Sequence, residues 1–339
     1  MRTEFQITND EAGARLQDVL AARYPMVSVG ALRRLMTSGH VWLKGALGTR
    51  NMLVATGDGV EIDLPEEGLA QTEPRRMKLE VLYEDASCVA INKPAGIAVV
   101  PERQNEDYAL MSGMLYYLQH DSPRATGELV RPMIVHRLDK DTTGVLVIAR
   151  TLTALRVLTE QFSGRKVSKE YLAIVRGRPP AEAELSFPLT AKGARAGRIL
   201  VDDHHGRPSQ TIIRTEEYFQ GYALVRAFPK TGRTHQVRVH LMAAGFPLVV
   251  DPLYSGRPAR IALYLSELKQ GYRQKAGFEE RPLISRQALH AHRLEFDVPA
   301  ADPGQMEHVA VEAPLPDDME LVLKMLRKWK RERGGNAEC

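Results

Sequence analysis

The sequence predicts an α+β fold with a mixed, mainly antiparallel central sheet flanked by helices, preceded by a small N-terminal α/β domain. Three observations support this class. Short runs rich in β-branched and aromatic residues outnumber the segments with helical periodicity. Strands and helices do not alternate regularly, as they would in a parallel βαβ fold. The 339 residues, 44% of them hydrophobic, leave room for one large domain and a small one.

Two short amphipathic helices are expected to open the chain. Apolar residues recur at helical spacing at Leu16, Val19 and Leu20 in the first helix and at Leu32, Leu35 and Met36 in the second. Ser28 is the expected N-cap of the second helix, and Gly39 marks its end. Three short strands, at 41–43, 52–55 and 60–64, follow between glycine-rich turns. We assign residues 1–65 to the small domain.

The rest of the chain divides into a linker, a large domain and a tail. Residues 66–77 are polar and without periodicity, which is typical of a linker. The large domain is expected at 78–333, and a flexible tail at 334–339. Its predicted strands lie at 79–83, 88–92, 145–149, 171–175, 210–214, 222–227 and 289–296. Its predicted helices lie at 107–119, 152–163, 235–244 and 317–331.

Cysteine usage and the N-terminal residues favour a reducing, cytoplasmic location. Of the two cysteines, Cys88 and Cys339, the second is the last residue, so a disulfide framework is not expected. The first residues lack the apolar core of a signal peptide, and no run approaches the ~18 apolar residues of a membrane span. We therefore expect no membrane partner.

The distribution of charge is more informative than the formal net charge of +4 at pH 7. The segment 23–57 carries no acidic residue and five cations, which are Arg23, Arg33, Arg34, Lys44 and Arg50. Such a stretch suits a polyphosphate partner such as a nucleic acid. A solvated basic surface without a partner is the alternative.

A loop that bears carboxylates precedes the most apolar predicted strand. Residues 135–144 read Val-His-Arg-Leu-Asp-Lys-Asp-Thr-Thr-Gly. The threonines can bond to the local backbone, and the glycine permits a tight turn. Loops held by rigid strands often carry catalytic groups, which makes Asp139 a candidate. The alternative is an ordinary polar turn in which Asp139 or Asp141 caps backbone groups.

The run His-Arg-Leu-Asp-x-x-Thr-Thr-Gly at 136–144 resembles the signature of the RluA-type pseudouridine synthases, which convert uridine in RNA to pseudouridine. The resemblance implies that Asp139 is the essential aspartate. It also implies that Arg137 helps to hold the target nucleotide out of its stack, and it places His136 among the RNA-binding residues. RNA is therefore the expected partner.

A second segment, at 169–177, resembles the Lys-x-Tyr-x-Ala-x-Val-x-Gly strand of the same family. This resemblance implies that Tyr171 is the active-site tyrosine, stacking on the uracil, and that Lys169 binds RNA. The structural alternative is that Tyr171 is an ordinary strand tyrosine, half buried in the core.

A third segment, at 231–241, resembles the Thr-Gly-Arg-Thr-His-Gln-Ile-Arg-Val-His-Leu segment of the family. This implies that Arg233 is the catalytic cation paired with Asp139. Thr234 is expected to cap the helix that follows. The chain departs from the family at Val250, where Gly usually precedes the Asp, and we expect this position to be structural.

The first 65 residues resemble the RNA-binding module first named for small-subunit ribosomal protein four. The shared pattern is Arg-Leu-x-x-x-Leu at 15–20, Gly-x-Val-x-x-x-Gly at 39–45 and Gly-Asp-x-Val at 57–60. The chain departs from that module at Gln17, where Asp is usual, and at Val29-Gly30, where a Ser-Arg pair is common. The resemblance implies that this domain contacts RNA through Arg33, Arg34 and Lys44.

The expected reaction requires no cofactor, because the isomerisation gains and loses no atom and involves no redox change. No metal is expected either. His235 and His240 are five residues apart, not the four that place two side chains on the same face of a helix. Neither His-Glu-x-x-His nor Cys-x-x-Cys occurs in the sequence.

We therefore expect a monomeric pseudouridine synthase whose substrate is large-subunit ribosomal RNA, because the N-terminal module accompanies many members directed to ribosomal RNA. The alternatives are the same chemistry on transfer RNA, a catalytically idle RNA-binding or ribosome-assembly protein, and a nucleoside hydrolase that releases free uracil. The sequence leaves open whether Asp139 attacks the uracil ring, attacks the anomeric carbon of ribose, or removes a proton from the neighbouring sugar carbon.

Overall fold

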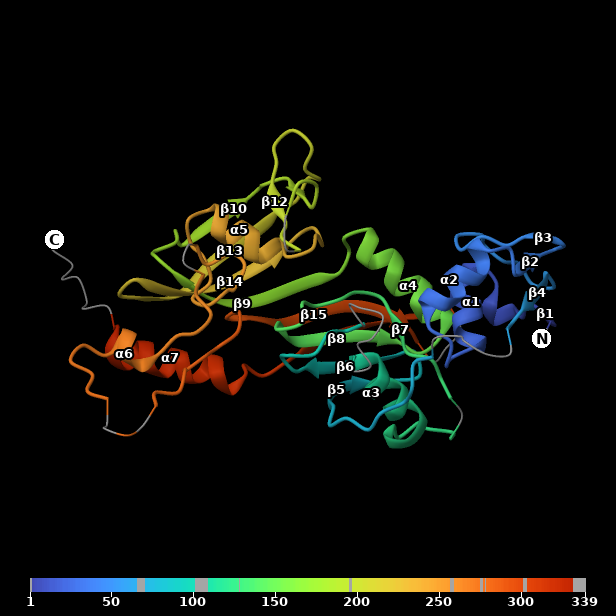
Figure 1. Ribbon diagram of the computed structural model, residues 1–339, viewed down its shortest axis with the longest axis horizontal. Helices are drawn as coiled ribbons and strands as arrows, with labels where there is room; N and C mark the ends of the chain where they lie inside the picture. The colour runs from blue at the N-terminus through green and yellow to red at the C-terminus, as the bar shows by residue number, and fades with distance from the viewer. Residues whose placement is uncertain are drawn as a thin grey trace.

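The computed structural model describes residues 2–65, 71–100, 109–127, 129–194, 197–256, 259–274, 277, 279–300 and 304–331. The expected tail at 334–339 and part of the expected linker, 66–70, lie outside these residues. Figure 1 shows an elongated molecule with the N-terminal unit at one end and helix α7 (Asp317–Trp329) towards the other. The α+β class is confirmed, and the boundaries of the domains stay a prediction.

The N-terminal unit is an antiparallel four-stranded sheet packed against two helices. The strand order is β1-β4-β2-β3. Its elements are β1 (Arg2–Gln6), the 3-10 helix η1 (Asn9–Glu11), α1 (Leu16–Arg23), α2 (Val29–Thr37), β2 (Val41–Leu43), β3 (Ala46–Leu47) and β4 (Gly59–Asp63). Buried residues between Ile7 and Ile62 form a hydrophobic core of their own.

Helix spacing and capping in this unit follow the sequence, whereas two of its strands do not. All six residues assigned to the helical stripes are buried, and the Ser28 hydroxyl accepts the Ala31 N–H at 3.2 Å. The predicted strand at 52–55 is wrong, because only Leu53 forms a bridge there, to Arg15. Strand β1 was not predicted, since its residues alternate between exposed and half-buried positions and none is fully buried.

The large sheet has ten strands and carries the rest of the described chain. Eight follow the order β10-β13-β14-β9-β15-β8-β6-β5, while β16 pairs with β15 and β7 with β8. Their bounds are β5 (Glu80–Glu84), β6 (Cys88–Lys93), β7 (Met133–Ile134), β8 (Thr143–Ala149), β9 (Ser168–Arg176), β10 (Glu182–Leu185), β13 (Thr211–Phe219), β14 (Tyr222–Pro229), β15 (Leu289–Pro299) and β16 (Met306–Glu312). Strands β11 (Leu189–Thr190) and β12 (Leu200–Val201) form a separate pair.

The sheet is mixed, as expected, and mainly antiparallel. Strand β15 runs parallel to β8, with His290 opposite Thr143, and antiparallel to β9 on its other side. The remaining strand pairs of the described sheet are antiparallel. Because β8 and β9 flank the same central strand, segments that lie far apart in the sequence meet there.

Helices cover both faces of the large sheet. Helix α3 (Leu110–Tyr116), which continues as the π-helix η2 (Tyr117–Asp121), and α5 (Gln236–Ala243) pack on one face. Helices α4 (Leu152–Ser163) and α7 pack on the opposite face. A short helix, α6 (Leu265–Leu268), contacts α7. The four predicted helices are confirmed, although the first begins at Leu110 and its expected residues 107 and 108 lie outside the described ranges. Helix α6 and strands β7, β10, β11, β12 and β16 were not predicted.

The N-terminal unit is anchored on the large domain beside α4. This helix contacts α1 and η1 on one side and β15 on the other (Figure 1). The Arg131 guanidinium donates to the carbonyl oxygens of Pro25 at 2.9 Å and Val27 at 2.6 Å. These bonds tie the two units at a point distant in sequence. In the described residues, no helix is long and apolar enough to cross a membrane.

Gly144 lets β8 approach β15 directly after the Asp139 loop. Its φ is +114°, and a Cβ at this position would lie 2.1 Å from the Ala291 carbonyl oxygen. Gly144→Ala is therefore expected to lower the free energy of unfolding by about 3 kcal/mol or more, through steric overlap and backbone strain. Urea denaturation measures this loss. Gly59→Ala is the control, because Gly59 has an ordinary φ and no heavy atom within 4 Å of its added Cβ. Equal stability of the two variants would contradict this account.

Candidate active site

Asp139 lies in the loop between β7 and β8, on the face of the sheet that carries α3 and α5. Its side chain is 21% exposed. The loop is braced from below by Lys93, whose ammonium donates to the carbonyl oxygens of Lys140 at 2.8 Å and Thr142 at 3.1 Å. Burial lowers the pKa of Lys93 to about 8. Gln287 on the segment before β15 donates to the Thr142 hydroxyl at 2.9 Å. The carboxylate therefore projects from a rigidly held loop.

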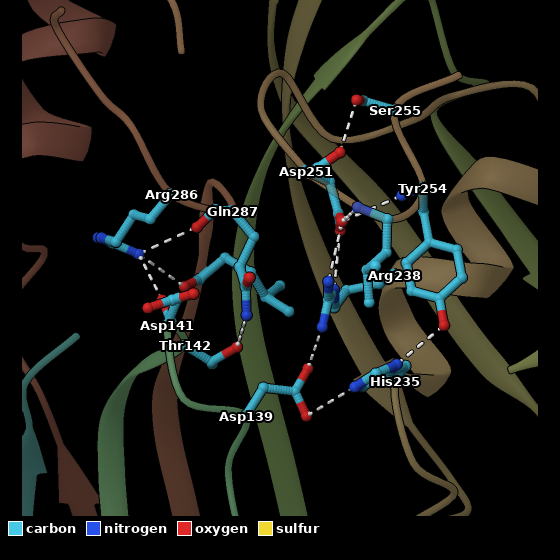
Figure 2. Close-up of polar contacts among 12 residues, drawn as sticks. Asp139, Asp141, Thr142, His235, Arg238, Asp251, Tyr254, Ser255, Arg286 and Gln287 are labelled. Atoms are coloured by element: carbon cyan, nitrogen blue, oxygen red, sulfur yellow. Dashed lines mark hydrogen bonds and ion pairs between the residues drawn. The ribbon is translucent and has the colours of Figure 1, made fainter. Parts of the chain in front are cut away.

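Arg238 of α5 bridges two carboxylates, as Figure 2 shows. Its Nη1 lies 2.7 Å from Asp139 Oδ2, and its Nε and Nη2 donate to Asp251 at 2.7 and 2.8 Å. Burial works against the charge of Arg238, but Asp251 and then Asp139 outweigh it and raise its pKa. Asp251 is fully buried and also accepts the N–H groups of Leu253 and Tyr254. The bidentate pair fixes the direction in which Arg238 presents its remaining N–H group to Asp139.

The expected ion pair between Arg233 and Asp139 is wrong, because Arg238 occupies that place. Arg233 precedes α5, whereas Arg238 lies in the first turn of the helix, on its buried side. In the described part of the chain Arg233 forms no ion pair, and its Nε is buried without a hydrogen-bond partner.

The start of α5 also differs from the expectation that Thr234 caps it. His235 is the N-cap residue, with a left-handed φ of 54°, and it makes no side-chain cap bond. The turn is held instead by Gln236, whose Oε1 accepts the Arg233 N–H at 3.0 Å and the Thr231 hydroxyl at 2.7 Å. The unusual backbone at His235 directs its ring towards Asp139.

His235 and Tyr254 complete the surroundings of Asp139. His235 Nε2 lies 3.8 Å from Asp139 Oδ1, and Nδ1 lies 2.8 Å from the Tyr254 hydroxyl (Figure 2). That hydroxyl accepts the Ile199 N–H at 2.7 Å, so its own proton is available to Nδ1. Burial lowers the pKa of His235, although the charge of Asp139 partly opposes it. At neutral pH the ring is then uncharged, with its N–H on Nε2, facing Asp139.

Tyr171 of β9 reaches the same region. It is half buried and packs against the clusters that contain Leu138 and Ala291 on one side and Val237 on the other. Burial and, next, the charge of Asp139 raise the pKa of its phenol. The structure thus brings Tyr171 within electrostatic reach of Asp139, and the phenol is protonated at neutral pH.

A cavity of about 390 Å³ opens beside Asp139. Its lining includes the Asp139 loop, the start of α5 and the turn that follows Asp251, represented by Arg137, His235, Arg238, Pro252 and Leu253. This volume lies in the range of small-ligand sites. The exposed Arg137 lines the cavity, and its contact with a target base stays a prediction.

His136 does not lie in this cavity, and its expected contact with RNA is corrected. Its Nε2 accepts the Val147 N–H at 2.9 Å, and its ring stacks on Phe162 of α4 with 4.6 Å between centroids. Burial and, next, the charge of Lys169 lower its pKa to about 3. His136 is therefore a neutral structural residue. Lys169 is half buried and donates to the Thr231 carbonyl oxygen at 3.2 Å.

The three residues of the N-terminal unit that are expected to contact RNA differ in the side-chain partners they have within the protein. The Lys44 ammonium forms an ion pair with Asp58 at 2.7 Å, at a hairpin turn where Lys44 has a φ of 52°. Arg33 donates to Gln17 at 2.8 Å, the position at which the module usually has Asp. Arg34 is part of the exposed face of α2 and has no ion pair among the described residues. Contacts of these residues with RNA stay a prediction.

Sequence reasoning missed Arg238, Asp251, His235 and Tyr254 as parts of the site. One signal was available: Arg238 is an arginine beside the apolar stripe of α5, three residues before Leu241. A charged residue in such a position requires a buried partner. Asp251, directly after the apolar run at 247–250, is an acid in a comparable setting. No group of three or more His, Cys, Asp or Glu side chains in the described residues is arranged to hold a metal ion.

Comparison with known proteins adds to this geometry. Residues 87–243, which contain Asp139, Tyr171 and Arg238, match the family model described as RNA pseudouridylate synthase. A solved structure of human RNA pseudouridylate synthase domain containing 4 is similar, with a TM-score of 0.56 and 28% identity, covering 73% of this chain and 93% of the human one.

Curated bacterial proteins are similar over nearly the whole length. A protein of Xanthomonas campestris named ribosomal large subunit pseudouridine synthase D is 35% identical over 322 residues, which is 95% of this chain and 92% of the relative. Proteins with the same name from Pseudomonas aeruginosa and Escherichia coli K12 are 33% and 31% identical, with 93% and 95% of this chain and 93% of each relative covered.

Proposed function

Because the chain belongs to the RluA-type RNA pseudouridylate synthase family, we propose that it converts specific uridines of large-subunit ribosomal RNA to pseudouridine, with Asp139 as catalytic carboxylate. As a member of this family it is an isomerase that acts on RNA. One observation carries the role of Asp139: its carboxylate lines a cavity of about 390 Å³, with the Arg238 guanidinium at 2.7 Å.

The chemistry requires one carboxylate and a closed pocket. The bond from uracil N1 to ribose C1′ breaks, a bond from C5 to C1′ forms, C5 loses a proton and N1 gains one. Asp139 supplies the negative charge at the sugar or the ring. Arg238 holds that carboxylate from one side and leaves Oδ1 facing His235. The detached uracil stays between these groups until it has turned, since the base has to rejoin the same ribose.

Tyr171 fits the role of a stacking surface for the uracil better than that of a resting base. The raised pKa of its phenol keeps the proton in place at neutral pH. Tyr171 is close enough to Asp139 for the carboxylate charge to affect its phenol, which supports contact with the target base. The proton leaving C5 is then taken by a carboxylate of the cavity wall, where Asp139 and Asp141 are present, because His235 already carries its proton on Nε2.

The target uridine has to leave its stack before Asp139 reaches it. Unstacking costs a few kcal/mol, which favours loops and single-stranded segments as targets. Arg137 is exposed and lines the cavity, which supports the proposal that it fills the vacated position. The N-terminal unit extends the basic surface and would select the region of ribosomal RNA that is presented.

The enzyme is further proposed to act as a monomer in the cytoplasm. Cys88 is buried as a free thiol, which agrees with a reducing compartment.

Tritium release tests the proposed function. The protein is incubated with large-subunit ribosomal RNA, or separately with transfer RNA, that carries tritium at C5 of uracil. Release into water from the ribosomal RNA, with no free uracil formed, is the expected result. Release from transfer RNA alone would show that transfer RNA, and not ribosomal RNA, is the substrate. Free uracil would show a hydrolase, and no release from either RNA would contradict a synthase.

A further inference from the structure

Three cations converge where β14 ends and β9 begins, on two neighbouring strands inside the large sheet. Arg165 follows the end of α4, Lys169 lies at the start of β9, and Lys230 follows β14. Burial and then the charges of Arg165 and Lys230 lower the pKa of Lys169 to about 8. Within the described ranges none of the three forms an ion pair, and Arg165 and Lys230 are exposed. Mutual repulsion without a neutralising acid is costly, and a bound anion removes that cost.

The backbone holds Arg165 in an uncommon conformation. Its φ is +59°, a left-handed value that is unfavourable for a residue with a side chain. The turn is fixed by the bond from Lys166 N to the Gln161 carbonyl oxygen at 2.9 Å. In this position Arg165 lines a second cavity, of about 260 Å³, together with Ser209, Gln210 and Thr231. The strained turn thus places the Arg165 guanidinium at the wall of this second cavity.

Lys169 links this surface to the catalytic residues. One of its three N–H groups donates to the Thr231 carbonyl oxygen, and Thr231 begins the loop that leads to His235 at the start of α5. Tyr171 lies two residues further along β9 on the same side, about 7 Å away at the usual rise of a strand. Lys169 therefore lies about one nucleotide away from the tyrosine proposed to stack on the target base, and not at that base itself.

We propose that Arg165, Lys169 and Lys230 form a binding site for backbone phosphates of RNA that flank the target uridine. The inference rests on the proposed function for the identity of the nucleic acid. Cations without acidic partners suit a polyanion, and the second cavity gives room for one strand beside the loop at 231–235. The site contacts phosphates and carries no sequence information, so it adds affinity and register.

The salt dependence of RNA affinity tests this proposal. We compare wild type with the double variant Arg165→Gln and Lys230→Gln, using the same ribosomal RNA transcript as in the tritium assay. Loss of two phosphate contacts should reduce the slope of log Kd against log salt concentration by about 1.4, at about 0.7 per contact with a single strand. The single-turnover rate at saturating RNA should stay within about twofold, because neither residue touches the reacting atoms.

Two matched variants serve as controls. The charge-conserving variant Arg165→Lys with Lys230→Arg should keep the wild-type slope. Lys324→Gln removes an exposed cation of α7, outside the proposed phosphate site, and should also keep it. An unchanged slope in the Gln double variant, or an equal loss in Lys324→Gln, overturns the proposal. If wild type binds RNA but releases no tritium, the proposed function fails. The change in salt slope between wild type and the Gln double variant then still shows whether the three cations bind phosphates.

Discussion

Replacing Asp139 with asparagine is expected to abolish tritium release, with a loss of about 10⁴-fold or more, while folding and RNA binding persist. Asparagine keeps the shape of the side chain and one oxygen that accepts from Arg238. It removes the negative charge that every route of the reaction requires. Because the side chain is 21% exposed and Arg238 keeps its bidentate bonds to Asp251, the fold does not depend on this charge.

Asp141→Asn is the matched control for this prediction, since it neutralises another acid in the same loop. Asp141 is not in contact with Arg238, and its carbonyl oxygen, which stays in the variant, accepts from Arg286 at 3.3 Å. Its single-turnover rate should remain within about tenfold of wild type, a small effect beside the loss of a group acting in the reaction itself. Equal losses in the two variants would contradict the assignment of Asp139.

Asp251→Leu should destabilise the protein by about 3–5 kcal/mol, because it leaves the buried guanidinium of Arg238 without its bidentate partner. Arg238 is 4% exposed and Asp251 is fully buried, so water does not replace the lost bonds. Without the bonds to Asp251, the Nη1 group of Arg238 is also no longer held in its orientation towards Asp139. The reaction rate should therefore fall by about 10²-fold or more. Urea denaturation and single-turnover tritium release measure the two effects.

The double variant Arg238→Met with Asp251→Leu separates stability from catalysis. Replacing both members of a buried ion pair by apolar residues often restores stability. We expect the double variant to regain most of the free energy of unfolding lost in Asp251→Leu, yet to remain as inactive. A double variant that recovers activity would show that Arg238 does not act on Asp139. A double variant that stays as unstable as Asp251→Leu would show that the unpaired Arg238 guanidinium does not cause the loss of stability.

Local patterns were sufficient for much of the fold and for the position of Asp139. The stripes of α1 and α2 and the cap at Ser28 depend on spacing along one helix, so they follow from the sequence. Asp139 is identified by a contiguous motif. Strand β1 depends on pairing with β4, more than fifty residues away, and its own residues show no buried face that would reveal it.

The cation of the active site was misassigned because a contiguous sequence motif does not show which of its arginines reaches Asp139. Arg233 and Arg238 belong to the same segment, and the choice between them depends on where α5 begins. The left-handed turn at His235 starts the helix late enough to direct Arg238 inward. Asp251 then fixes that direction from a different loop, so the partner of Asp139 follows from tertiary structure.

The most direct test of the account is the structure of the Asp139→Asn variant bound to its RNA substrate. We expect the target uridine out of its stack and inside the cavity of about 390 Å³, with its base against Tyr171 and its sugar beside residue 139. Arg238 should remain paired with Asp251. A target uridine that stays stacked in the RNA, or that binds at a site remote from residue 139, would contradict the proposal that this carboxylate acts on it.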